Sequence, residues 1–302
     1  MSVDLAARRA WYAQDLSLRA PIQRNQAITD AFATVPREKF LGPAPWRLMA
    51  DARPDLPFTT TPDADPGWLY HDVLVSIDLT RNLNNGMPSF WAKNFDHLDL
   101  KPGQRVLQVG AGTGYYSAVL AELVGASGHV TAVEYDAELA IKARANLSDW
   151  KQVEVVAGDG RLHDAGEVDR IVVFAGATHP APLWLDRLSH GGQLLMPLTA
   201  SRWFGFLLLA TRPPLPAEGR DENCFEARSI GGVGIFPCAG GRDDEAAERL
   251  QLAWERVLRE ADNRRPPEIP IKALYQGNPP DDAADRVWYS GPGFWLERKK
   301  QA

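Results

Sequence analysis

The sequence predicts an α/β protein in which helices cover both faces of a doubly wound, mostly parallel sheet. Short β-branched runs alternate with stretches of helical spacing, which is typical of parallel strands joined by helices. These runs cover residues 105–110, 129–134, 153–159 and 170–176. Two later runs, 191–198 and 203–210, are nearly continuous in apolar residues, as expected of strands buried on both faces.

The composition is that of an ordinary folded protein. The chain has 302 residues, of which 45% are hydrophobic, and this excludes a disordered or collagen-like protein. The length suits one large domain with extensions. Because Asp and Glu exceed Lys and Arg to give a formal charge of −6, we expect no nucleic acid partner.

The sequence contains no pattern typical of export, membrane insertion or metal binding. The first residues have no apolar stretch before a cleavage site, and no run of 18 apolar residues occurs, so we expect a cytoplasmic protein with no membrane partner. Cys224 and Cys238 have neither CxxC spacing nor a histidine at ligand spacing. We therefore expect free, buried thiols and no metal site.

The segments that flank the alternating region have distinct patterns. Apolar residues between Ile22 and Val35 recur at near-helical spacing until Pro36, which predicts a helical lead-in within residues 1–50. Residues 51–68 are rich in Pro, Asp and Thr, which predicts a loop. Towards the C-terminus, the sequence predicts a charged amphipathic helix at about 243–261 and a hairpin around 291–293.

The strongest functional signal is a glycine-rich turn after the first strand. The segment 106–116 runs from a buried strand through Gly110, Gly112 and Gly114 into a helix that covers 116–123 and ends at Gly125. Glycines at such a turn let the backbone approach a ligand closely. A tight turn without a ligand is the alternative, and the turn by itself does not decide between the two.

Acidic residues follow the next two strands. Glu134 ends the strand 129–134, where a carboxylate can accept hydrogen bonds from both hydroxyls of a ribose. Asp159 stands between Gly158 and Gly160, where it can accept a hydrogen bond from an adenine amino group. A helix cap for Glu134 and a simple turn for Asp159 are the alternatives.

These features together predict an adenosyl ligand. The nicotinamide dinucleotide NAD fits the first two features, but Tyr115 stands where the dinucleotide fingerprint requires a third glycine for the pyrophosphate. S-adenosylmethionine has no phosphate and tolerates the bulkier residue. We therefore expect S-adenosyl-L-methionine as the cofactor.

In these motifs the chain resembles the protein-L-isoaspartate O-methyltransferases, a family of class I S-adenosylmethionine-dependent enzymes. The resemblance covers about residues 22–200, with a weaker similarity at 225–255. It lies in AFATVPREKFLGP, LKPGQRVLQVGAGTGYYSAVLAELVG, AVEYDAELAIKARANL, VEVVAGDG, RIVVFAGA and LSHGGQLLMPL. The resemblance implies a Rossmann-like methyltransferase fold, which suggests an N-terminal helical and loop segment at 1–80, the methyltransferase domain at 81–262 and a C-terminal extension at 263–302.

The resemblance also implies roles for individual residues. Gly110, Gly112 and Gly114 would line the methionine and ribose portion of the cofactor, Glu134 would hold the ribose hydroxyls, and Asp159 with Gly160 would meet the adenine. The remaining positions of these segments that we assign to the cofactor are Ala111, Thr113 and Tyr135. The family's reaction is methyl esterification of the abnormal carboxylate of an L-isoaspartyl residue.

One departure from the family concerns the substrate loop. The family carries a Thr, Ser and Pro segment that receives the substrate carboxylate, and this aligns with 84–88, so that Gly86 stands in place of the functional Ser. The amides of Asn84, Asn85 and Gly86 can donate hydrogen bonds to a carboxylate instead. A simple turn is the alternative. Gln108, where family members often have an acidic residue, is a second departure.

The acceptor decides whether a general base is required. A carboxylate is already ionised at neutral pH and needs none, whereas a hydroxyl or amine acceptor would need one. The candidates for such a base are His71, Asp72 and His179.

We expect an S-adenosylmethionine-dependent methyltransferase that acts on an isoaspartyl or aspartyl carboxylate of a protein or peptide. One alternative is an enzyme of the same fold that acts on a peptide natural product or a small metabolite. The other is a relative that binds the cofactor without catalysis.

Overall fold

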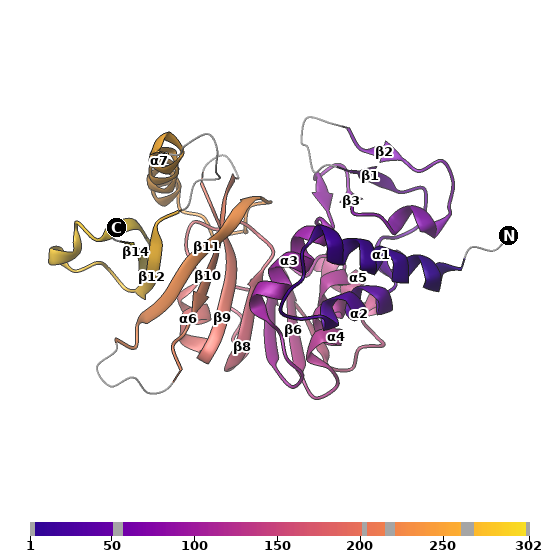
Figure 1. Cartoon of the computed structure of the whole chain (residues 1–302), viewed down its shortest axis with the longest axis horizontal. Coiled ribbons are helices and arrows are strands. Elements are labelled where there is room, and N and C mark those ends of the chain that lie inside the picture. Colours follow the sequence, from indigo (N-terminus) through magenta and orange to yellow (C-terminus); the bar gives the residue numbers. More distant parts are fainter. Residues whose placement is uncertain (1–3, 51–56, 201–203, 215–220, 261–268, 300–302) are drawn as a thin grey trace. The chain divides into compact units, whose positions relative to one another are not determined.

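The computed structural model describes residues 4–50, 57–200, 204–214, 221–260 and 269–299. The chain forms two compact units (Figure 1). The first comprises residues 1–104 and 111–157, and the second comprises 105–110 and 158–302. The chain therefore passes from one unit to the other three times: between residues 104 and 105, within the glycine-rich turn, and after the strand that precedes Asp159.

The first unit holds the N-terminal helices, a small sheet and two parallel strands. Its helices are α1 (Leu5–Arg19), α2 (Ala27–Thr34), α3 (Pro88–Leu98), α4 (Tyr115–Val124) and α5 (Ala137–Asn146), with short 3-10 helices at Arg37–Phe40 and Pro66–Leu69. Its strands are β1 (Arg47–Met49), β2 (Thr59–Thr60), β3 (Leu74–Asp78), β4 (Leu83–Asn84), β6 (His129–Glu134) and β7 (Val153–Ala157).

The helical lead-in is confirmed and consists of α1 and α2, which lie side by side in Figure 1. Asp4 caps α1, since its carboxylate accepts hydrogen bonds from the amides of Ala6 and Ala7 at 3.0 and 3.2 Å. Aromatic side chains join the two helices to α4, which follows the glycine-rich turn. Phe32 of α2 makes edge-to-face contacts with Tyr12 of α1 and with Tyr115 of α4.

The predicted loop at 51–68 is partly ordered into secondary structure. Thr59 and Thr60 form β2, which pairs with β1 in an antiparallel sheet of order β2-β1-β3-β4. Residues 51–56 lie outside the described residues. The strands of this sheet are too short to be recognised from a period-two pattern. The sheet packs on a small apolar core. That core consists of Leu41, Trp46, Leu69, Val73 and Val75.

The alternating pattern is confirmed for β6, α5 and β7. The strands β6 and β7 pair in parallel, from Val130 opposite Val153 to Glu134 opposite Ala157. Asp136 caps α5 directly after β6, because its carboxylate accepts from the amides of Glu138 and Leu139. The strand β6 therefore ends at Glu134, next to the start of a helix.

The second unit holds the larger sheet. Its strands are β5 (Arg105–Val109), β8 (Val168–Val173), β9 (Leu188–Thr199), β10 (Phe204–Thr211), β11 (Cys224–Gly234), β12 (Ile271–Gln276), β13 (Val287–Gly291) and β14 (Phe294–Arg298). Its helices are α6 (Pro182–Arg187) and α7 (Asp244–Glu260), with a short 3-10 helix at Asp281–Ala283.

The strands of the second unit follow the order β13-β14-β12-β11-β10-β9-β8-β5. The strands β5, β8 and β9 are parallel, whereas β10 to β14 continue the sheet in antiparallel pairs. The α/β class with parallel strands is therefore confirmed. The apolar runs of β9 and β10 reflect burial rather than direction, since their central residues are buried although the two strands are antiparallel.

The C-terminal part adds a helix and a hairpin, both as predicted. α7 begins after Asp243, whose carboxylate accepts from the amide of Ala246 at 2.7 Å. Trp254 of α7 stacks on Phe206 of β10, with ring centroids 5.7 Å apart. The hairpin of β13 and β14 turns at 291–293 and pairs with β12.

Candidate active site

The glycine-rich turn and the end of β6 meet within the first unit. The amide of Gly112 donates a hydrogen bond to Oε2 of Glu134 at 2.6 Å, and the amide of Asp136 donates to Oε1 at 2.9 Å. Glu134 is only 8% exposed, and this burial raises the pKa of its carboxyl. Each carboxylate oxygen retains further acceptor capacity, so Glu134 can hold the turn and a ligand hydroxyl at the same time.

The turn leaves room at Gly112 and none at Gly114. A Cβ atom at Gly112 would meet only Cδ1 of Ile77, at 4.0 Å, among the described residues. Gly114 has φ +97°, and a Cβ there would lie 2.8 Å from Cδ1 of Leu147 on the helix side. The turn therefore packs on the protein at Gly114, while space remains beside Gly112.

Tyr115 is a packing residue. Its ring is buried against Phe32 and Phe40, at centroid distances of 6.2 and 5.7 Å, and its hydroxyl lies 3.5 Å from that of Tyr12. The third glycine of a dinucleotide turn is replaced here because α1 and α2 supply an aromatic pocket for the side chain.

The other predicted turn residues are placed as follows. The amide of Ala111 donates to the carbonyl of Val133, and the carbonyl of Thr113 accepts from Nδ2 of Asn146. Tyr135, next to Glu134, is 65% exposed. The contact of this ring with the cofactor stays a prediction.

Asp159 and Gly160 lie in the second unit. Asp159 binds Arg161 with both oxygens, through contacts of 2.5 Å to Nη2 and 3.1 Å to Nε. Although burial acts to raise it, the pKa of Asp159 is lowered by the hydrogen bonds and charge of Arg161. The guanidinium also donates to the carbonyl of Gly240. Asp159 is therefore an ionised acceptor that is already oriented by one partner.

Gly160 brings the Asp159 segment against β5. A Cβ atom there would lie 2.7 Å from Cγ1 of Val109, the residue before Gly110. The carbonyl of Gly160 accepts from Nε1 of Trp184 at 2.8 Å. The second unit therefore brings Gly160 and the start of the glycine-rich turn together. Gln108, where the family often has an acidic residue, is fully buried in β5.

Gly86, in the proposed substrate loop, is tightly packed. This residue has φ +76°, and a Cβ there would lie 2.7 Å from Nε1 of Trp91. Its carbonyl accepts from the hydroxyl of Tyr116 at 3.0 Å, and its amide donates to Oδ1 of Asn84 at 2.9 Å. The Gly86 amide thus already has a partner in Asn84, and its hydrogen bond to a substrate carboxylate stays a prediction.

Asn85 is held by Arg37, a residue that the sequence did not single out. Oδ1 of Asn85 accepts from the amide of Val75 at 3.0 Å and from Nη2 of Arg37 at 3.4 Å. Nδ2 of Asn85 is buried and has no partner among the described residues. Donation from the side-chain amides of Asn84 and Asn85 to a substrate carboxylate stays a prediction.

Arg37 is fully buried and binds the backbone of the segment that precedes this loop. Its guanidinium donates to the carbonyls of Leu69, His71 and Val73 at 2.6, 3.0 and 2.6 Å. A single arginine in a Pro-Arg-Glu sequence carries no pattern that would reveal such a role. The signal appears only when the three carbonyls converge in the fold.

The candidate bases are separated by their contacts. His71 is exposed, and Asp72 accepts from the amide of Ser89 at 2.9 Å and so caps the start of α3. His179 is half-buried, and Nδ1 of its ring lies 2.9 Å from Oγ1 of Thr178. Burial lowers the pKa of His179.

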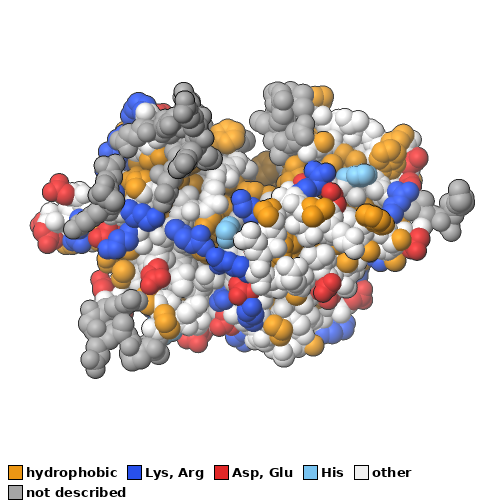
Figure 2. All heavy atoms as spheres, in the orientation of Figure 1, with side chains coloured by type: hydrophobic (Ala, Val, Ile, Leu, Met, Phe, Trp, Pro, Cys, Tyr) orange, Lys and Arg blue, Asp and Glu red, His pale blue; other side chains and the backbone are white. Residues whose placement is uncertain are grey.

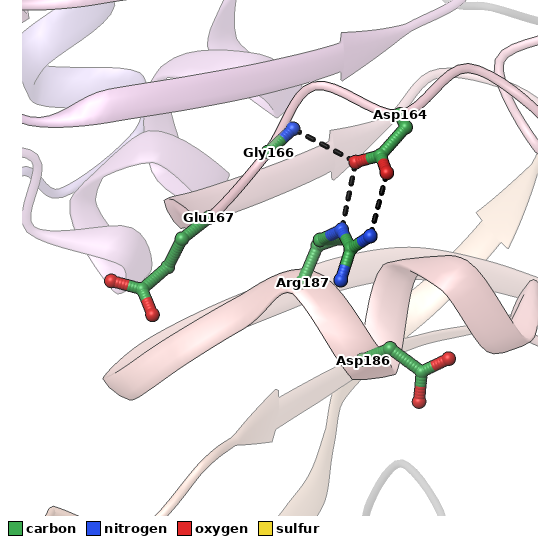
Figure 3. Close-up of a pocket in the computed structure, with 5 residues that line it drawn as sticks. All are labelled: Asp164, Gly166, Glu167, Asp186 and Arg187. Atoms are coloured by element: carbon green, nitrogen blue, oxygen red, sulfur yellow. Dashed lines mark hydrogen bonds and ion pairs between the residues drawn. The ribbon is translucent and has the colours of Figure 1, made fainter.

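A separate hollow of about 460 Å³ lies in the second unit (Figure 3). Asp164 and Arg187 form a two-contact ion pair across it, at 2.7 and 2.6 Å, and Glu167 and Asp186 lie at its rim. Its lining includes none of the predicted site residues. We therefore assign it no part in the reaction.

The structure also bears on the expected absences. In the parts of the chain that are described, no helix has the length and apolar content needed to cross a membrane, and no cluster of three metal-ligating side chains occurs. Cys224 and Cys238 are unpaired, and Cys238 is buried, whereas Cys224 is only partly buried. Acidic, basic and apolar side chains are interspersed on the face drawn in Figure 2.

Comparison with solved structures identifies the fold class. A solved protein-L-isoaspartate O-methyltransferase matches with a TM-score of 0.63 at 20% identity, over 97% of this chain and 88% of its own. A solved protein of Plasmodium falciparum, described as a complex with S-adenosyl-L-homocysteine, matches with a TM-score of 0.56 at 17% identity, over 76% and 97% of the two chains. The fold is that of the class I methyltransferases, as expected.

Sequence similarity then identifies the family. The family model for protein-L-isoaspartate(D-aspartate) O-methyltransferase matches residues 62–207. The protein-L-isoaspartate O-methyltransferase of Methanothermobacter thermautotrophicus is 31% identical over 232 residues, which cover 75% of this chain and 93% of that protein. That of Methanothrix thermoacetophila is 36% identical over 179 residues. The chain belongs to the protein-L-isoaspartate O-methyltransferase family, and it is an S-adenosylmethionine-dependent methyltransferase.

Proposed function

We propose that this protein transfers a methyl group to the side-chain carboxylate of an isoaspartyl or aspartyl residue in a protein or peptide. The observation that carries the proposal is the contact of Gly112 with Glu134, which joins a turn with open space to a buried carboxylate at a strand end. Membership of the family supports the choice of acceptor.

The residues proposed for the cofactor have the chemistry it requires. Glu134 would accept hydrogen bonds from the ribose hydroxyls, and the turn from Gly110 to Gly114 would lie along the ribose and methionine. Asp159 would accept from the adenine amino group, next to Gly160, and the exposed ring of Tyr135 would contact the nucleoside. When bound, S-adenosylmethionine supplies a methyl group on a sulfonium, which is displaced in line by the acceptor.

The acceptor side needs positioning rather than a base. A carboxylate with an ordinary pKa near 3.9 is ionised at neutral pH and attacks without losing a proton. We infer that Asn84 and Asn85 donate hydrogen bonds to this carboxylate, since Nδ2 of Asn85 is otherwise unsatisfied. Orientation of the two reactants can supply several kcal/mol, on the order of 7–11, of the barrier reduction.

Two measurements test the proposal. Calorimetry with S-adenosyl-L-homocysteine measures binding of the cofactor product, and radiolabelled methyl transfer compares an isoaspartyl peptide with the matching aspartyl peptide. Incorporation into either peptide supports a carboxylate acceptor, and a preference for the isoaspartyl peptide assigns repair. Tight binding without transfer to either peptide contradicts the proposed acceptor.

The tight packing at Gly86 favours a second candidate function. Because a serine at this position would meet Trp91, the loop offers the acceptor no hydroxyl where the family has one. An acceptor other than the isoaspartyl residue, in a peptide natural product or a small metabolite, suits a loop that presents only amide groups. Methylation of such a compound but of neither peptide would establish this alternative.

We also propose that the enzyme works in the cytoplasm on protein or peptide substrates and not on nucleic acid. The unpaired thiols and the net charge of −6 support this.

A further inference from the structure

A polar chain ends at His179, a short distance after the carboxyl end of β8. The amide of Asp243 donates to Oγ1 of Thr178 at 3.1 Å, and Oγ1 of Thr178 lies 2.9 Å from Nδ1 of His179. A hydroxyl that accepts from a backbone amide still has its own proton to donate. We infer that the Thr178 hydroxyl donates this proton in a hydrogen bond to Nδ1. Nδ1 of the neutral ring is then the acceptor, and the proton of the ring is on Nε2.

A tyrosine of the C-terminal extension binds the backbone of Thr178. The hydroxyl of Tyr289, on β13, donates to the carbonyl of Thr178 at 2.8 Å and lies 3.3 Å from the carbonyl of Ala246. Tyr289 is 3% exposed, and burial raises its pKa, so the hydroxyl remains a donor. Tyr289 lies beyond the residues 62–207 that the family model matches.

The ring of His179 is free on its other side. Nε2 has no hydrogen-bond partner among the described residues. It is also not one of the polar atoms of these residues that are both buried and unsatisfied. The ring is half-buried, and its pKa is lowered by burial, while the charge of Asp243 acts to raise it and that of Arg161 to lower it further. At neutral pH the ring therefore presents an N–H donor without a charge.

His179 follows a strand that lies next to the start of the glycine-rich turn. Within the second unit, β5 pairs in parallel with β8, from Val106 opposite Arg170 to Val109 opposite Val173. A Cβ at Gly110 would lie 3.3 Å from Cβ of Phe174, so the glycine-rich turn begins beside the segment that leads to His179. Within the second unit, Gly110 after β5 and the segment of Asp159 and Gly160 are proposed for the cofactor, whereas the end of β8 carries no such residue. Ligands of open α/β sheets bind at the carboxyl ends of the strands.

We propose that His179 donates a hydrogen bond from Nε2 to the peptide that carries the acceptor carboxylate, and that Tyr289 of the C-terminal extension is a positioning residue for it. This inference rests on the proposed function. It gives the extension a role in acceptor binding, because the Tyr289 hydroxyl holds the backbone of the residue that precedes the histidine.

Steady-state kinetics with an isoaspartyl peptide test the inference, together with calorimetry using S-adenosyl-L-homocysteine. His179→Ala is expected to raise the KM for the peptide about tenfold, the effect of one lost hydrogen bond to a polar or charged group, with unchanged binding of the cofactor product. His179→Gln should restore most of the affinity, because a glutamine amide also donates. Tyr289→Phe should raise the same KM by a smaller factor.

Two variants serve as matched controls. His190→Ala removes an exposed histidine of the same unit, and Tyr275→Phe removes a hydroxyl of the same extension that contacts Glu297. Both should leave the KM unchanged. If the wild type methylates the peptide and His179→Ala has the wild-type KM, the inference fails and the proposed function stands. If His179→Ala and His179→Gln both lose kcat at an unchanged KM, the histidine is a base rather than a donor, which also overturns it. If the wild type methylates no carboxylate peptide, both proposals fail.

Discussion

The position of a side chain at Gly86 is already taken by Trp91. A Cβ at Gly86 would lie 2.7 Å from Nε1 and 3.1 Å from Cδ1 of the indole, and 3.5 Å from Cε2 of Tyr116. The glycine also has φ +76°, a conformation that non-glycine residues adopt at a cost. A serine at this position would therefore have to displace the Trp91 indole and adopt a strained backbone conformation.

Gly86→Ser should destabilise the protein and should not raise isoaspartyl methylation. Backbone strain of about 1–3 kcal/mol adds to overpacking of similar size. Gly42→Ser is the matched control, since Gly42 has φ +69° with nothing within 4 Å of a Cβ, so it carries the strain alone. Chemical denaturation of the two variants separates the terms. Equal losses of stability would show that Trp91 yields to the new side chain.

Arg37→Met should destabilise the protein more than any exposed arginine does. The substitution leaves the carbonyls of Leu69 and Val73 without their donor, at about 1–3 kcal/mol for each buried unsatisfied group. Arg19→Met, at an exposed ion pair with Asp15, should change the free energy of unfolding by less than about 1 kcal/mol. If urea midpoints show similar small losses for both variants, water replaces the guanidinium at those carbonyls.

Glu134→Gln should weaken binding of S-adenosyl-L-homocysteine by about 1–3 kcal/mol, because an amide accepts fewer hydrogen bonds from hydroxyls than a carboxylate does. Glu138→Gln, on the exposed first turn of α5, should bind as the wild type does. Calorimetry measures both. Wild-type affinity in Glu134→Gln would remove Glu134 from the proposed cofactor site.

The pH dependence of cofactor binding should follow the raised pKa of Glu134. Because burial raises that pKa, the carboxylate is protonated at a higher pH than an exposed glutamate, and affinity for the cofactor product should fall on acidification from that point.

The effect of this pKa on folding stability has the opposite sign. A carboxyl whose folded pKa is raised adds stability below its unfolded pKa, and this contribution is lost as the pH rises through the folded pKa. Binding isotherms and denaturation curves between acidic and neutral pH test the two signs, and a binding profile identical to that of Glu134→Gln would contradict the assignment.

Asp159→Ala should weaken binding of the same ligand by about 1–3 kcal/mol if Asp159 holds the adenine. Asp164→Ala is a close control, since it also removes a carboxylate that binds an arginine through two contacts, in the hollow drawn in Figure 3. That variant should leave ligand affinity unchanged. A loss of affinity in both variants would indicate a general effect on the second unit.

Much of the fold and part of the site could be predicted because the signals are local. The strands β5 to β8, the turn at Gly112 and the acidic strand end at Glu134 are all encoded within short stretches of alternating or glycine-rich sequence. The small sheet of β1 to β4 could not, since its strands are too short for a pattern. Arg161, two residues after Asp159, could have been noted as a partner from its spacing alone.

The sequence by itself determined the order of strands and helices, the glycine-rich turn and the family, since these depend on residues close together in the chain. Only the tertiary structure decided which distant residues hold the segments around Gly86, Asn85 and Thr178. Tyr116 meets Gly86 across 30 residues, Arg37 meets Asn85 across 48, and Tyr289 meets Thr178 across 111. Hydrogen bonds of this kind depend on where the fold brings distant backbone carbonyls and side chains together, and no local pattern records that.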